Sequence, residues 1–92
     1  MDVKSAVQLA TSYILELFKN EEISNVGLEE AEFNNSESTW IVTIGFSRPW
    51  DYPKDSLTTL TGDVRPSRSY KVITIRDAEE QVVSIKNRPQ DA

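Results

Sequence analysis

The most regular β pattern in the chain is the stretch Trp40-Ile41-Val42-Thr43-Ile44-Gly45-Phe46-Ser47. Large apolar side chains occupy every second position from Trp40 to Phe46, and a β-strand directs alternate side chains to one face. The pattern predicts a strand over residues 39–47 that is buried on this face. Gly45 lies in its interior, where a glycine favours a bend.

The N-terminal segment predicts the helix that covers this face, over residues 3–20. Its apolar residues recur at spacings of three and four, which is typical of an amphipathic helix. They are Val3, Val7, Ala10, Ile14, Leu17 and Phe18. Ser5 and Gln8 match a capping box, and Asp2 is an alternative N-cap one turn earlier.

Three further stretches predict strands, over residues 26–33, 69–76 and 82–87. In the first, the apolar residues change parity midway, so a bulge near Glu29 and Glu30 is needed to bring them to one face. Polar turns separate the strands, and residues 88–92 are expected to form a frayed tail.

These elements predict an α+β fold in one domain, residues 1–92. One N-terminal helix packs on one face of a four-stranded antiparallel sheet, with a long loop, residues 47–69, between the second and third strands. The expected core is Val7, Ala10, Ile14, Leu17, Leu28, Phe33, Trp40, Val42, Ile44, Phe46, Val72 and Val83. The expected outer face holds Ile41, Thr43, Ile73 and Ile75. A mildly apolar outer face would suit a second copy of the protein, joined through the sheet.

The composition excludes several classes of chemistry. The 92 residues include no cysteine and no histidine, which removes disulfides, thiol nucleophiles and the most common general base. No phosphate-binding glycine loop is present. The glutamates at 29, 30 and 32 lack the spacing of a calcium loop. We therefore expect no metal, no cofactor and no catalytic residues.

Charge and hydropathy indicate the setting of the chain. The net charge is −5, which argues against nucleic-acid binding because phosphate neutralisation needs clustered Lys and Arg. No apolar run approaches the roughly 20 residues of a membrane span, and no signal peptide is evident. We expect a cytoplasmic protein that does not enter membranes. Residues 1–47 hold eight acids and two bases, whereas residues 48–92 hold seven acids and eight bases.

The 47–69 loop is the most distinctive segment, because connections this long are usually functional or disordered. Arg48, Trp50 and Tyr52 lie among prolines at its start, and Arg65 and Arg68 near its end, with Lys71 just beyond. Trp, Tyr and Arg are enriched at binding hot spots. The loop therefore predicts a partner-binding surface. In the alternative interpretation the aromatic residues cap the core and the arginines pair with acidic strand residues.

The order of these pieces resembles PepSY-like and, more broadly, cystatin-like small α+β domains. The residues that carry the resemblance are Ala6 and Ala10 in the helix, Trp40-Ile41-Val42, Tyr70-Lys71-Val72, and Asp77-Ala78 ahead of Val82-Val83. The chain has Glu80-Gln81 where such families usually place a glycine. The resemblance implies a helix wrapped by an antiparallel sheet, and a role in binding or inhibition.

These observations together favour a non-enzymatic protein-binding domain that uses the 47–69 loop, the outer sheet face, or both. The identity of its protein partner does not follow from the sequence. The alternative is an immunity or inhibitor protein whose acidic face blocks a basic toxin or a peptidase.

Overall fold

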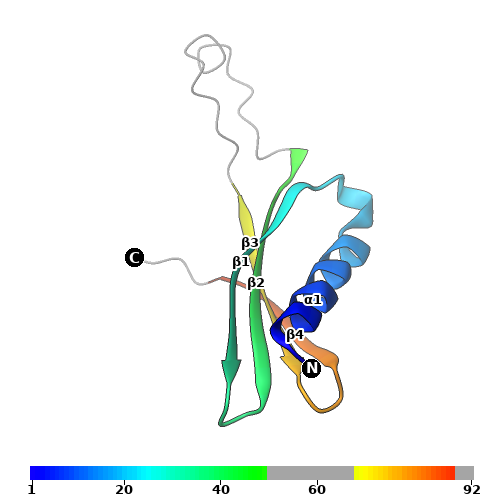
Figure 1. Ribbon diagram of the computed structural model, residues 1–92. Coiled ribbons are helices and arrows are strands. Elements are labelled where there is room, and N and C mark those ends of the chain that lie inside the picture. The colour runs from blue at the N-terminus through cyan, green and yellow to red at the C-terminus, as the bar shows by residue number, and fades with distance from the viewer. Residues whose placement is uncertain (50–67, 89–92) are drawn as a thin grey trace.

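The computed structural model describes residues 1–49 and 68–88 (Figure 1). Its elements are α1 (Val3–Leu17), a 3-10 turn η1 (Lys19–Glu21), β1 (Ser24–Asn34), β2 (Thr39–Ser47), β3 (Ser69–Arg76) and β4 (Gln81–Asn87). The helix packs against a four-stranded antiparallel sheet, so the predicted α+β fold class is confirmed. Most of the predicted loop and the last four residues of the predicted tail lie outside the described residues.

The strands follow one another in the sheet in chain order, β1-β2-β3-β4. Leu28 pairs with Ile44 and Glu30 pairs with Thr43, so Glu29 is the extra residue of a bulge in β1. This is the bulge that the parity change of the sequence predicted. It brings Leu28, Ala31 and Phe33 to the same face of the sheet, because their partners on β2 alternate without interruption.

The helix begins at Val3 because Asp2 caps it. The Asp2 side chain accepts a hydrogen bond from the Ser5 backbone N–H at 2.8 Å. Ser5 itself lies inside the first turn, so the capping box at Ser5 and Gln8 is wrong and the alternative cap is correct. The helix ends at Leu17, three residues earlier than predicted, and Glu22 then turns the chain through a left-handed conformation (φ 51°).

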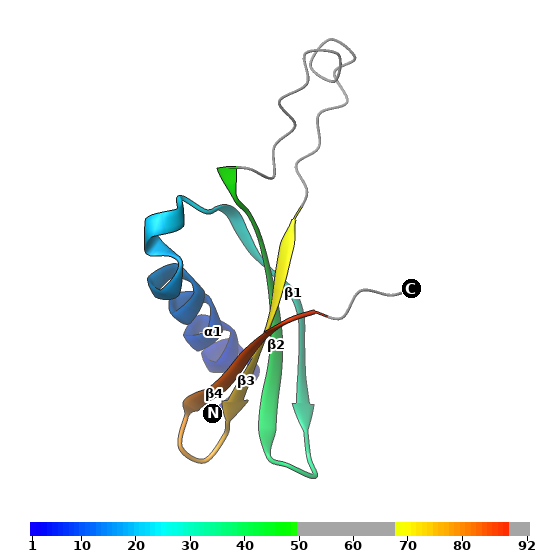
Figure 2. The ribbon, with the colours of Figure 1, turned by 180° about the vertical axis from the view of Figure 1, so that it is seen from behind.

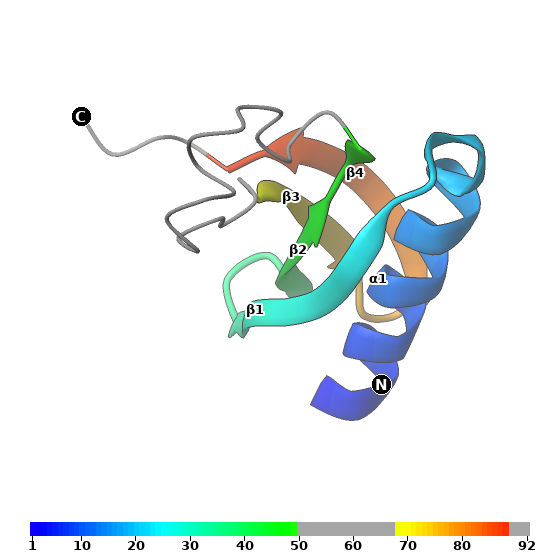
Figure 3. The same cartoon turned by 90° about the horizontal axis from the view of Figure 1, so that it is seen from above.

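The core lies between α1 and the concave face of the curved sheet, as Figure 3 shows. Ala6, Ala10 and Ile14 of α1 are fully buried against apolar residues of β2 and β3. The buried sheet residues are Val42, Ile44, Phe46, Ile73 and Ile75. Because two of the three buried helix residues are alanines, the helix axis approaches the sheet closely.

The core face of β3 differs from the prediction. Ile75 pairs with Trp40 and Ile73 pairs with Val42, and directly opposed residues of an antiparallel pair lie on the same face. Ile73 and Ile75 are therefore buried beneath the helix instead of facing outward. Val72, placed in the core by the prediction, pairs with Thr43 on the outer face and is half-buried.

Four other residues predicted for the core are exposed: Leu17, Leu28, Phe33 and Val83. Leu17 is the last residue of the helix, and Leu28 and Phe33 lie on the edge strand β1, where coverage by the helix is incomplete. A register shift between Thr74 and Ile75 turns Val82 and Ile85 toward the core and leaves Val83 outside. Because Ile73 and Ile75 are buried beneath the helix, the outer face is less apolar than expected. A homodimer through this face stays a prediction.

A polar contact joins the two hairpins at the end of the sheet where α1 begins. The Trp40 indole N–H donates to Asp77 Oδ1 at 2.8 Å, and the N-terminal ammonium lies 3.7 Å from the same oxygen. The Asp77 backbone N–H donates to the Ser38 carbonyl at 3.0 Å. Both hairpin turns lie at this lower end in Figure 1.

None of the helices in the described ranges combines the length and the apolar character needed to cross a bilayer.

We predict that Ala10→Leu destabilises the protein, because a larger side chain cannot enter the closely packed contact between α1 and the sheet. Overpacking of this kind costs about 1–3 kcal/mol in the free energy of unfolding. Urea denaturation of the purified chain measures the loss. Leu15→Gln is the matched control: Leu15 is exposed on the same helix, and its change should stay within about 0.5 kcal/mol. Equal losses for both variants would contradict the close packing.

We predict that the stabilisation of the fold by the Asp2 cap is lost at low pH, when the Asp2 carboxylate becomes protonated. The hydrogen bonds from the backbone and side chain of Ser5 lower the pKa of Asp2 from its ordinary value of 3.8. A lowered native pKa means that the cap stabilises the fold fully above pH 3.8 and that this contribution is lost as the pH falls below it. Asp2→Asn keeps a capping acceptor that does not titrate. Between pH 6 and pH 2, the midpoint temperature of thermal unfolding should therefore fall more steeply for the native chain than for Asp2→Asn.

Candidate functional site

Four cations gather at the end of the sheet opposite the two hairpins. Arg48 follows β2, Arg68 precedes β3, Lys71 lies near the start of β3, and Arg88 follows β4. The register places them together, because Phe46 pairs with Ser69 and Lys71 pairs with Asn87. We call this group, Arg48, Arg68, Lys71 and Arg88, the basic end.

On the helix side of the basic end, Arg48 lies over two aromatic rings. Its guanidinium is 5.0 Å from the centre of the Phe18 ring and 5.4 Å from that of Phe46, within the range of a cation–π contact. The two rings themselves are 5.1 Å apart and tilted by 43°. Arg48 Nε also lies 3.7 Å from a carboxylate oxygen of Glu21. Arg48 is thus held in place from two directions.

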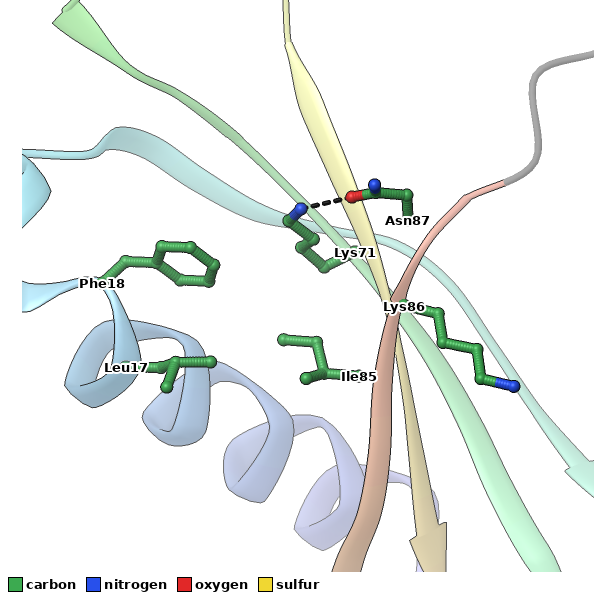
Figure 4. Close-up of a pocket in the computed structure, with 6 residues that line it drawn as sticks. All are labelled: Leu17, Phe18, Lys71, Ile85, Lys86 and Asn87. Atoms are coloured by element: carbon green, nitrogen blue, oxygen red, sulfur yellow. Dashed lines mark hydrogen bonds between the residues drawn. The ribbon is translucent and has the colours of Figure 1, made fainter.

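Lys71 lies beside Arg48 on the same side. Its ammonium donates a hydrogen bond to the Asn87 side-chain oxygen and is 5.9 Å from the centre of the Phe18 ring (Figure 4). Burial lowers the pKa of Lys71, and the positive charge of Arg48 lowers it further, while Glu21 raises it in part. The protein therefore holds this cation where its charge is not fully compensated.

Arg68 extends across the outer face of the sheet. Its guanidinium Nη2 is 3.4 Å from a carboxylate oxygen of Glu29, the bulged residue of β1. The pair crosses directly over Gly45: a Cβ at that position would lie 2.8 Å from both charged groups. Gly45, predicted to favour a bend, thus also makes room for this ion pair because it has no side chain.

Arg88 stacks on Tyr70 at the end of β4. Its guanidinium lies 3.8 Å from the centre of the Tyr70 ring, and its backbone N–H donates to the Tyr70 carbonyl at 3.2 Å. Residue 88 lies beyond the end of β4, as predicted, and this one backbone hydrogen bond ties it to β3; residues 89–92 of the predicted tail lie outside the described residues.

Two of the five residues singled out from the sequence, Arg48 and Arg68, lie at the same end of the sheet. They lie on the two faces of that end, Arg48 on the helix side and Arg68 on the outer side. Arg68 contacts Glu29 of β1, which agrees with the alternative interpretation of the arginines, whereas Arg48 contacts Glu21 of the 3-10 turn η1. Trp50, Tyr52 and Arg65 lie outside the described residues.

Arg88 and Tyr70 were not among the site residues predicted from the sequence. The signal that could have found them is the register of the last hairpin: once Lys71 is opposed to Asn87, the first residue after β4 falls beside Tyr70. Apolar residues occur at both parities of β3 and β4, so the sequence allows more than one register, and this pairing is visible only in the folded chain.

The described ranges hold no group of three or more carboxylates placed to bind a metal ion. Comparisons with protein families, with curated proteins and with solved structures found no match to the chain.

We predict that Lys71→Met raises the free energy of unfolding at pH 7, by a few tenths of a kcal/mol, about what a partly exposed charge contributes. Methionine keeps an unbranched apolar stem and removes a cation that burial and Arg48 disfavour. A lowered native pKa means that the penalty is present while Lys71 is charged and fades as the pH rises through that pKa toward the ordinary 10.5. Urea denaturation should therefore show a smaller difference in the free energy of unfolding between the variant and the native chain at pH 10.5 than at pH 7. A difference that grows as the pH rises would contradict the conclusion that burial and Arg48 disfavour the charged form of Lys71.

Proposed function

We propose that the protein is a non-enzymatic protein-binding domain and that the basic end is its binding surface. The observation that carries the proposal is the gathering of four cations on the ends of three strands, three of them within 6 Å of an aromatic ring centre. Arginine and aromatic side chains held rigid before binding are the usual anchors of protein interfaces, because little side-chain entropy is lost on association.

The same cations favour an acidic partner surface. Within the described residues, Arg48 and Arg68 contact carboxylates, whereas no carboxylate lies within ion-pair distance of Lys71 or Arg88. Lys71 and Arg88 therefore supply the charge that a partner carboxylate would meet. Opposite charges at the edge of an interface raise the rate of association and lose this effect as salt screens them.

A second function, an immunity or inhibitor protein that blocks a basic target, is favoured by the opposite end of the sheet. The two hairpin turns lie together there (Figure 2), and they carry Glu37, Asp77, Glu79 and Glu80. Asp77 is engaged with Trp40, so the exposed glutamates would carry the contact. The two functions thus place the partner at opposite ends of the molecule.

We predict that Arg88→Glu weakens capture of the partner about tenfold or more, because the substitution places a negative charge where an acidic surface docks. Arg76→Glu is the matched control, since it makes the same change of charge at the hairpin end, where Arg76 is exposed. Quantitative affinity capture on the full chain, at low and high salt, measures both variants. If Arg76→Glu strengthens capture and Arg88→Glu leaves it unchanged, the partner binds at the acidic end and the inhibitor function is favoured instead.

A further inference from the structure

A pocket of about 360 Å³ opens at the helix side of the basic end. It lies between the end of α1 and the end of β4 and is lined by Leu17, Phe18, Lys71, Ile85, Lys86 and Asn87. We call it the corner pocket. Figure 4 shows Ile85 extending toward Leu17 and Phe18, Lys71 meeting Asn87 above them, and Lys86 pointing away from the helix.

The inner wall of the corner pocket is apolar. Leu17 is 52% exposed although it is the last residue of a helix whose neighbouring turns pack on the sheet. Ile85 and Phe18 border the core and are half-buried. The pocket volume lies near the lower limit of about 300 Å³ for small-ligand sites. An apolar group of side-chain size that entered it would cover Leu17 and complete the packing of Phe18 and Ile85.

The rim of the corner pocket carries an excess of positive charge. Lys71 lies on the rim, Arg48 shares the Phe18 ring with it, and Glu21 is the carboxylate that faces both. Glu21 lies within ion-pair distance of Arg48, but no carboxylate of the described residues lies within that distance of Lys71. A carboxylate supplied by a ligand would pair with Lys71, and Asn87 offers an amide beside the same position.

The corner pocket also adjoins a free sheet edge. β4 is the last strand in the order β1-β2-β3-β4, so one row of its backbone groups has no neighbouring strand in the described part of the chain. Extended peptides bind such edges by adding a strand, and pockets beside the edge select their side chains. This edge favours a peptide as the occupant over a free fatty acid, which would gain nothing from backbone groups.

We propose that the corner pocket binds an extended acidic segment of the partner protein, with one large apolar side chain held by Leu17, Phe18 and Ile85 and an adjacent carboxylate held by Lys71. The segment lies along the free edge of β4. This inference rests on the proposed function and specifies the chemistry of the partner: an apolar residue flanked by aspartate or glutamate.

The test is a fluorescence anisotropy titration of the full chain with a labelled peptide of sequence Ser-Glu-Leu-Glu-Ser. Two further peptides separate the contributions, one with serine in place of leucine and one with glutamine in place of both glutamates. We expect each to bind at least about tenfold more weakly, because one loses the apolar contact and the other the charged hydrogen bond. Octanoate serves as a non-peptide competitor and should not displace the peptide.

Variants of the protein locate the site. Leu17→Ser and Lys71→Met should each weaken binding of the leucine peptide about tenfold. Both residues are partly exposed at the end of an element, so the fold should persist, and thermal unfolding checks this. Arg76→Met is the control at the hairpin end and should leave the dissociation constant within about twofold.

The inference is overturned if the serine peptide binds as well as the leucine peptide, because charge alone would then explain the affinity. It is also overturned if Lys71→Met and Leu17→Ser bind the peptide like the native chain, or if octanoate alone binds. Loss of partner capture in Arg88→Glu together with native capture in Leu17→Ser would reject the corner pocket and keep the proposed function. Peptide binding that depends on Leu17, with capture unaffected by Arg88→Glu, would keep the pocket and reject the basic end as a whole.

Discussion

The close contact between α1 and the sheet positions everything else in the described structure. Ala6 and Ala10 have no side chains beyond Cβ, so the helix backbone approaches the sheet closely, nearest to β1 and β2, and Ile14 fills the space near its end. A sheet with one covering helix must place its largest apolar residues beneath that helix. The curvature of the sheet around α1 and the burial of Phe46 follow from this contact.

The same contact builds the basic end. Because the helix ends at Leu17, Phe18 turns onto Phe46, and the pair of rings forms a surface at the end of the core. Arg48 leaves β2 directly over this surface, and Lys71 approaches the Phe18 ring from β3. On the other face Gly45 opens room for Arg68 and Glu29, while Arg88 stacks on Tyr70. The positions of the cations on both faces of the sheet therefore depend on where the apolar core ends.

Much of the fold could be predicted from local pattern. The observed strands begin and end within two residues of the predicted bounds, and the bulge at Glu29 follows from the change of parity in β1. The inward face of β3 could not be predicted in this way. Val72 and Thr74 on one face, and Ile73 and Ile75 on the other, are both sets of β-branched residues. Only the pairing of Val42 with Ile73 decides which set is buried.

The sequence by itself determined the element order, the fold class, the face of β2 that meets the helix, and the chemistry that a chain without cysteine and histidine lacks. These properties depend on residues near one another in the chain, or on composition alone. The tertiary structure decided the inward face of β3, the separation of Arg48 and Arg68 onto opposite faces, the stacking of Arg88 on Tyr70, and the corner pocket. Each of these depends on strand register and on where the helix ends over the sheet, and both are set by packing between distant segments.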